Sequence, residues 1–218
     1  MLQEKLHALG DKLSNDEFDG LPDPEKIVDE ALAELRKTWL RQLSPRKEDG
    51  FRLRMSNVGK PLCQLQMGAS GAKPKRKSYN FKTQMMIGDA VEAIADIYLA
   101  LAEVNVTSSK DDVKLDVGDV TIKGTDDVEI DHKVYDIKSC SPWAFDNKWA
   151  HGYESLKQDD PFGYVGQLTG YANAKGKEVG GWIVINKSTG HLVVVEADAS
   201  ENEKVMNLFN IQNNVEAV

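Results

Sequence analysis

The sequence predicts an α/β fold, in which a mixed central β-sheet is flanked by helices and preceded by an N-terminal helical extension. Three observations support this prediction. Apolar residues recur at helical spacing in the first half of the chain, apolar runs typical of strands follow, and another helical stretch separates the early strands from the late ones. With 218 residues and 41% hydrophobic content, the chain is long and apolar enough to bury a full core.

We expect the first 50 residues to form the helical extension and residues 51–218 to form the main domain. Residues 1–20 are polar with weak periodicity, which predicts a short, loosely held helix. The stretch 24–42 predicts a longer helix, because apolar residues recur along one side of it. Glycine, proline and lysine are frequent over 56–78, which predicts a loop that becomes ordered on substrate.

A third helix is predicted over residues 83–103. At 100° per residue its apolar side chains form one stripe, and Glu92 lies at the border of that stripe. This position predicts a half-buried carboxylate, and an ordinary boundary carboxylate is the alternative interpretation. The stripe consists of Ile87, Val91, Ile94, Tyr98 and Leu101.

Strands are predicted from alternating and continuous apolar runs in the second half of the chain. Residues 113–123 alternate well enough for one or two strands, and shorter strands follow over 128–130 and 134–139. Residues 182–186 and 191–196 then predict a closing β-hairpin.

Between these strands, residues 160–176 predict a helix with an Asp-Pro start and with Gly176 as its stop. A final helix is expected near 201–208. Glycine weakens a helix, so the three glycines inside the 160–176 stretch need a reason. Close approach to the sheet or to a phosphate backbone would supply one. These glycines are Gly163, Gly166 and Gly170.

The strand around Asp136 carries two charged residues in an otherwise apolar run. Successive side chains of a strand point to opposite faces, so Asp136 and Lys138 share one face while Ile137 points into the core. The turn Gly124-Thr-Asp-Asp127 comes shortly before, and a short hairpin would bring Asp127 beside Asp136. Two carboxylates and a lysine predict a site for a hard cation, with a charged group for a water or a phosphate.

Four motifs stand in order between residues 88 and 171: Gly88-Asp-Ala-Val-Glu92, Gly124-x-x-Asp127, Asp136-x-Lys138 and Gln167-Leu-Thr-Gly-Tyr171. Together they resemble the PD-(D/E)xK metal-dependent nucleases. The last motif matches the Q-x-x-x-Y signature of the RecB-type and lambda-type exonuclease branch. The resemblance implies a restriction-endonuclease-like core that hydrolyses DNA, first of all as an exonuclease in recombination, repair or phage DNA processing.

The resemblance also implies which residues act. Glu92, Asp127 and Asp136, with the backbone carbonyl of Ile137, would hold Mg²⁺, or Mn²⁺ as its substitute. Lys138 would complete the catalytic set with the three acids, because its ammonium group can orient the attacking water or stabilise the phosphate.

Asp126 competes with Asp127 for the role of metal ligand. We prefer Asp127, because it completes the G-x-x-D motif and would share a strand face with Glu129 and Asp131. Asp126 would instead sit in the turn.

The charge of the chain is unevenly distributed. Its net charge is -8, yet 13 of its 27 basic residues and only 2 of its 35 acidic residues lie within 36–82. A basic segment suits contacts with phosphates. We expect Lys73, Lys75, Arg76 and Lys77 to bind DNA, and a solvated surface loop is the alternative.

Two further features concern the substrate. Gln167 and Tyr171 lie at i and i+4 on one helix face, and the resemblance assigns them to positioning the active site and substrate. The segment 141–158 is rich in aromatic residues. They could stack on unpaired bases or anchor an irregular loop onto the sheet.

Several classes of protein are disfavoured. Cys63 and Cys140 cannot form a four-cysteine iron–sulfur cluster, and the histidines are too scattered for a zinc site. No run of 18 apolar residues exists, so we expect a soluble, cytoplasmic protein that does not bind membranes. The resemblance implies that its partner is DNA and that the cell is bacterial or phage-infected. A homo-oligomer and a recombination partner protein remain open. So do an endonuclease on the same core and an inactive DNA-binding relative.

Overall fold

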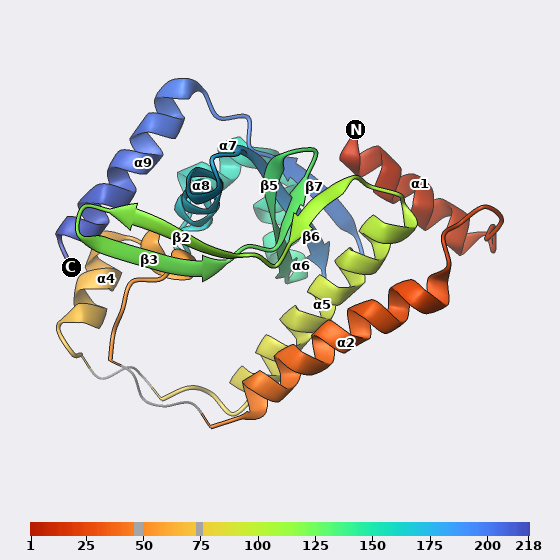
Figure 1. Cartoon of the computed structure of the whole chain (residues 1–218), viewed down its shortest axis with the longest axis horizontal. Helices are drawn as coiled ribbons and strands as arrows, with labels where there is room; N and C mark the ends of the chain where they lie inside the picture. Colours follow the sequence, from red (N-terminus) through yellow and green to blue (C-terminus); the bar gives the residue numbers. More distant parts are fainter. Residues whose placement is uncertain (46–49, 73–75) are drawn as a thin grey trace.

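The computed structural model describes residues 1–45, 50–72 and 76–218. A mixed five-stranded sheet in the order β1-β4-β5-β6-β7 forms the centre, with helices around it (Figure 1). Strands β5 and β6 are parallel and the other neighbours are antiparallel. The α/β fold class and the N-terminal helical region are therefore as predicted. The strands are β1 (Val106–Ser109), β4 (Val128–Ile130), β5 (Lys133–Cys140), β6 (Glu178–Asn186) and β7 (Leu192–Glu196).

A separate antiparallel hairpin stands beside the central sheet. It consists of β2 (Asp112–Val117) and β3 (Val120–Thr125), so the alternating stretch contains two strands. Alternate side chains on one face, Val113, Leu115 and Ile122, are buried in the core. The opposite face of the hairpin is exposed to solvent.

Helix α1 (Leu2–Ser14) is packed firmly on the sheet, so the expectation of a loosely held helix is wrong. Leu6 and Leu9 are buried, and the backbone N–H of Val194 donates a hydrogen bond to the side chain of Gln3 at 2.9 Å. Two leucines spaced three residues apart suffice for this anchoring, although the remaining polar residues hide them in a periodicity analysis.

Helix α2 (Pro24–Leu43) lies along helix α5 (Phe81–Leu101), as Figure 1 shows. The side chain of Asp23 caps α2, as expected for an Asp-Pro start. Between the two helices the indole N–H of Trp39 donates to the carbonyl of Met86 at 3.2 Å. Both helices begin and end close to their predicted bounds.

The buried face of α5 differs from the predicted apolar stripe. Val91, Ala95 and Leu99 are buried against the sheet, whereas Ile87 and Ile94 are 42% and 46% exposed. Small side chains such as Ala95 allow the helix to approach the sheet closely. The close packing gained in this way stabilises the helix orientation more than burial of Ile87 and Ile94 at the edge of the stripe would.

The stretch expected to be a loop contains two helices, so that expectation is wrong. They are α3 (Met55–Val58) and α4 (Leu62–Ala69). Met55, Val58 and Leu65 are buried. Glycine and proline in this stretch end helices and allow close packing, rather than making the chain flexible.

The second face of the sheet is covered by α8 (Tyr164–Lys175), with α9 (Glu201–Glu216) packed on it. Helix α8 begins at Tyr164 with Gly163 as its N-cap residue, so the predicted start at Asp160 and Pro161 is wrong. The side chain of Asp160 instead reaches forward and accepts hydrogen bonds from the first two backbone N–H groups of the helix. Gly176 ends it in a left-handed conformation, as predicted. No helix in the described part of the chain has both the length and the apolar character needed to cross a bilayer. Three short elements complete this layer: α6 (Pro142–Asn147), η1 (Trp149–His151) and α7 (Gly152–Gln158).

The glycines of α8 allow close approach, but to α3 rather than to the sheet. A Cβ atom on Gly166 would lie 2.5 Å from the Cα atom of Gly59, and one on Gly170 would lie 2.5 Å from the sulfur of Met55. Gly163 meets the backbone of Gly59 as well and has a φ of 76°. These contacts bring the segment after α3 directly against α8.

Candidate active site

Strand β5 positions the first two side chains of the site. Even-numbered residues of β5 face the core on the α8 side, and Ile137 faces the core on the α5 side. Asp136 and Lys138 therefore project together, and Lys138 Nζ lies 2.6 Å from Asp136 Oδ2. This arrangement matches the strand geometry predicted from the sequence.

Asp127 lies at the end of the β4–β5 hairpin, directly before β4. The hairpin pairs Val128 with Tyr135, and Asp127 Oδ2 accepts a hydrogen bond from the Ile137 backbone N–H at 2.7 Å. The N–H and C=O groups of one strand residue point to the same side of the strand. By this geometry the Ile137 carbonyl points to the same side of β5 as Asp127. The structure brings Asp127 and Asp136 together.

Asp136 is buried, with 2% of its surface exposed. Its Oδ2 atom lies 2.6 Å from the ammonium nitrogen of Lys138. A carboxylate buried in this way needs an opposite charge beside it. It is a suitable ligand for a cation.

The charges of the site are not balanced. Burial raises the pKa of Asp127 to about 8, and the neighbouring Asp136 carboxylate contributes to this rise. Burial likewise raises the pKa of Glu92 to about 8, with a contribution from Asp127. Burial acts to lower the pKa of Lys138, but Asp136 and Asp127 outweigh it, so this pKa is raised. Three carboxyl groups therefore repel one another here, and a divalent cation would relieve their repulsion.

Glu92 reaches the site from helix α5. The charged groups that act on it include Asp127, Lys138 and Lys110. Lys110, which the sequence analysis missed, forms an ion pair with Asp96 at 2.6 Å and thereby borders the site. No motif in the sequence identifies Lys110, because only the folding of β1 toward α5 brings it there.

The donor atoms fit a Mg²⁺ ion. No group of three or more His, Cys, Asp or Glu side chains in the described residues is arranged as a metal site. Mg²⁺, however, is commonly held by one or two carboxylates and keeps several waters. Asp127, Asp136 and the carbonyl of Ile137 supply such a set of oxygen atoms, and Glu92 lies near Asp127.

Gln167 and Tyr171 lie together on α8 beside the turn that carries Asp127. Tyr171 is 4% exposed and shares a side-chain hydrogen bond with Gln167. Burial raises its pKa, and the charge of Asp127 contributes. A Cβ atom on Gly124 would lie 2.9 Å from the Tyr171 hydroxyl oxygen. The buried tyrosine thus packs against Gly124, three residues before Asp127.

The aromatic residues near the site divide into two groups. Trp149 and Tyr153 pack on Trp182, with ring centroids 6.1 and 6.2 Å apart, and so anchor their segment to the sheet. Tyr164, which the sequence analysis missed, places its ring 5.4 Å from Lys138 Nζ. Phe162, 57% exposed, stacks on Tyr164 at 5.4 Å. These two rings form an exposed aromatic edge next to the site.

Asp126 belongs to a different cluster from its neighbour Asp127. It is buried and forms an ion pair with Lys175 of α8 at 2.7 Å. Glu129 joins this cluster through Lys175 at 3.2 Å and Lys177 at 3.1 Å. Glu129 is therefore held by lysines of the α8 side rather than by the groups around Asp127.

The basic run lies partly in the described chain. Arg76 and Lys77 are exposed, and Lys77 Nζ lies 4.1 Å from the ring centroid of Phe81. Lys73 and Lys75 lie outside the described residues. The role of all four residues in binding DNA stays a prediction.

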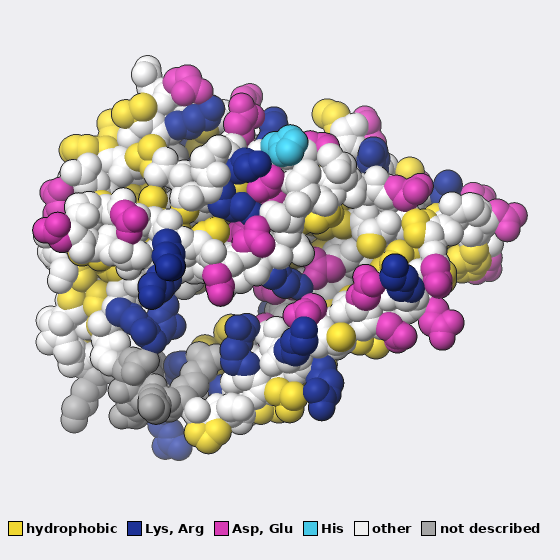
Figure 2. Space-filling model, viewed as in Figure 1, with side chains coloured by type: hydrophobic (Ala, Val, Ile, Leu, Met, Phe, Trp, Pro, Cys, Tyr) yellow, Lys and Arg dark blue, Asp and Glu magenta, His cyan; other side chains and the backbone are white. Residues whose placement is uncertain are grey.

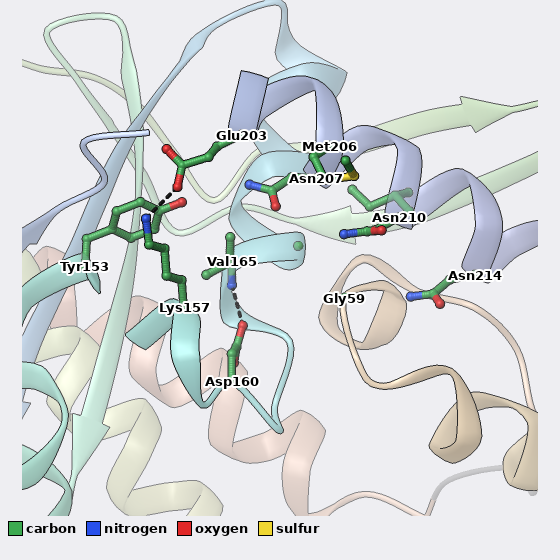
Figure 3. A pocket seen from close by; sticks show the side chains of 12 residues that line it. Gly59, Tyr153, Lys157, Asp160, Val165, Glu203, Met206, Asn207, Asn210 and Asn214 are labelled. Atoms are coloured by element: carbon green, nitrogen blue, oxygen red, sulfur yellow. Dashed lines mark hydrogen bonds and ion pairs between the residues drawn. The ribbon is translucent and has the colours of Figure 1, made fainter. Parts of the chain in front are cut away.

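Away from the candidate active site, a cavity of about 240 Å³ lies between α7, α8 and α9 (Figure 3). Lys157 on its wall forms ion pairs with Glu203 and Glu154, both at 2.6 Å. Its positive charge is thus already balanced, and the cavity is a poor site for an anion. The rest of the wall carries asparagine side chains: Asn207, Asn210 and Asn214.

Comparisons with known proteins give no function. No model of a protein family matches the chain, and no curated protein matches it. Among solved structures it is similar to one titled "Crystal structure of SSO0001", with 16% sequence identity and a TM-score of 0.47. The match covers 84% of this chain and 83% of the other.

Proposed function

We propose that this chain is a Mg²⁺-dependent deoxyribonuclease that hydrolyses phosphodiester bonds, and specifically an exonuclease. One observation carries the proposal. The hydrogen bond from the Ile137 N–H to Asp127 and the ion pair between Lys138 and Asp136 gather two carboxylates and an ammonium group in the middle of β5, just past the residues that pair with β4. This is the chemistry that hydrolysis of a phosphate diester needs, and the four motifs that resemble PD-(D/E)xK nucleases meet at the same place.

The residues divide the chemical work between them. Asp127, Asp136 and the Ile137 carbonyl would hold Mg²⁺, with Glu92 beside Asp127. The bound ion would supply a water of lowered pKa and neutralise charge on the phosphate. Lys138 is placed to stabilise the negative charge that develops on the phosphate oxygens, because its ammonium group projects beside both carboxylates.

Replacement of the strand residues tests the proposal. Asp136→Asn and Lys138→Ala should each lower DNA cleavage by at least about 100-fold, since each removes a charge that acts in the transition state. Cleavage by the wild type should require Mg²⁺ or Mn²⁺, fail with Ca²⁺ and stop in chelator. The assay follows release of nucleotides from end-labelled linear DNA, and circular dichroism checks the fold.

A matched control uses an exposed ion pair far from the site in sequence. Lys204 and Glu201 on α9 lie 2.7 Å apart. Lys204→Ala and Glu201→Gln should cleave DNA at the wild-type rate. Near-wild-type cleavage by either β5 variant, or equal rates in chelator, would refute the proposed mechanism.

A further inference from the structure

The exposed face of the β2–β3 hairpin carries two lysines directly opposite each other. Lys114 on β2 pairs in register with Lys123 on β3, and both are exposed. Like charges on directly opposed residues destabilise an antiparallel pair. Folding alone therefore does not account for this arrangement.

Two acids lie on the same face as these lysines. Asp112 accepts a hydrogen bond from Thr125 at 2.9 Å, and Asp116 accepts one from Thr121 at 2.6 Å. Neither Lys114 nor Lys123 forms an ion pair with a carboxylate in the part of the chain that the structure describes. The excess of positive charge arises in the hollow beside this face, whose lining combines both lysines with two arginines and one acid, Asp112.

The lysine face borders a hollow of about 770 Å³ between the hairpin and residues 51–54. Arg52 and Arg54 line its other side, and Phe51, 39% exposed, adds an aromatic ring. Figure 2 shows Lys and Arg side chains gathered below the hairpin, beside the central opening of the molecule. A basic groove with an aromatic side chain is typical of surfaces that bind single-stranded nucleic acid.

The hollow is close in the chain to the candidate active site. Gly124 and Thr125 line it, and Asp127 follows two residues later. Four residues of extended chain span at most about 14 Å, so Lys123 lies within that distance of Asp127 along the backbone. A strand whose phosphate lies at Asp127 can thus continue over the hairpin.

We propose that the β2–β3 hairpin and residues 51–54 bind the phosphate backbone of a single DNA strand that extends from the active site. This inference rests on the proposed function in one respect. The DNA strand is taken to run from Asp127 to the hairpin because the proposed function places the cleaved phosphate at Asp127. The binding surface itself can be tested without cleavage.

The test measures binding of a labelled single-stranded oligonucleotide in chelator, by fluorescence anisotropy over a range of salt concentrations. The double variant Lys114→Gln, Lys123→Gln should bind about tenfold or more weakly at low salt, and the slope of log affinity against log salt should fall by about 1.4, or about 0.7 for each lost phosphate contact. Its melting temperature should not fall, because the variant relieves a like-charge pair.

Two controls decide the interpretation. Lys5→Gln with Lys12→Gln removes the same charge from exposed positions of α1 and should leave affinity and slope unchanged. Lys114→Arg with Lys123→Arg keeps the charge and should keep binding. An unchanged slope in the hairpin variant, or an equal loss in the α1 variant, would overturn the proposal. Because chelator prevents metal-dependent cleavage, this result is independent of whether wild-type protein cleaves DNA.

Discussion

Two adjacent aspartates, Asp126 and Asp127, have different partners and therefore different expected roles. Asp127 is hydrogen-bonded to the backbone of β5 and lies beside Asp136 and Lys138. Asp126 is bound to Lys175 at 2.7 Å and to the backbone N–H of Asp111 at 2.7 Å. The carboxylate of Asp127 is repelled by that of Asp136, whereas the carboxylate of Asp126 is paired with the ammonium group of Lys175. We infer that Asp127 acts in catalysis and that Asp126 holds the turn in place.

Substitution of each aspartate by asparagine should separate these roles. Asp127→Asn should lower DNA cleavage by at least about 100-fold and leave stability near that of the wild type, because it removes a charge from a crowded group. Asp126→Asn should lower the free energy of unfolding by about 1–3 kcal/mol, because it weakens a buried ion pair. Urea denaturation and a cleavage assay measure the two effects. The opposite pattern would reassign the metal ligand to Asp126.

At the scale of secondary-structure elements, α8 packs closely on the segment after α3. Gly59, Gly163 and Gly166 bring two backbones within the space that a single methyl group would fill. Close-packed interiors tolerate added atoms poorly. Since α8 also carries Tyr171 and Lys175, this contact determines how the helix presents both residues to the Asp127 turn.

A pair of glycine-to-alanine variants tests this packing. Gly166→Ala would place a Cβ atom 2.5 Å from the Cα atom of Gly59 and should destabilise the protein by about 1–3 kcal/mol. Gly10→Ala in α1 meets no atom within 4 Å and should stabilise it by up to about 1 kcal/mol, because alanine favours helix formation. Urea unfolding of both variants gives the comparison. A stable Gly166→Ala variant would show that α8 can shift away from Gly59.

At the scale of the whole molecule, acidic and basic side chains are separated. Lys and Arg gather around the central opening, while Asp and Glu are frequent at the right-hand end of the view in Figure 2. The carboxylates of the candidate active site lie on β5 and on the turn that follows the basic hairpin. This distribution supports the proposed path, in which a DNA strand is held by positive charge and cleaved at Asp136 and Lys138 of β5.

A requirement for a DNA end should follow from such a path. Linear DNA should be degraded progressively to short products, and covalently closed circles of the same sequence should survive. Gel electrophoresis of one plasmid, before and after a single cut, provides a matched comparison. Cleavage of closed circular duplex and of circular single strands as fast as linear DNA would replace the exonuclease by an endonuclease on the same core.

The sequence by itself determined the features that depend on local geometry. The alternation of a strand places Asp136 and Lys138 on one face and Ile137 on the other, whatever surrounds them. A short hairpin then brings Asp127 next to Asp136. The long helices α2 and α5 were predictable for the same reason, because their periodicity is carried by neighbouring residues in the chain.

Only the tertiary structure decided the features that depend on contacts between distant residues. The ion pair of Asp126 with Lys175 spans 49 residues, and the packing of Gly59 on Gly166 joins segments that are far apart in sequence. The order of α3 and α4 and the firm anchoring of α1 arise in the same way, because each depends on burial against elements elsewhere in the chain. A local pattern cannot specify such contacts, since their free energy exists only once the whole core has formed.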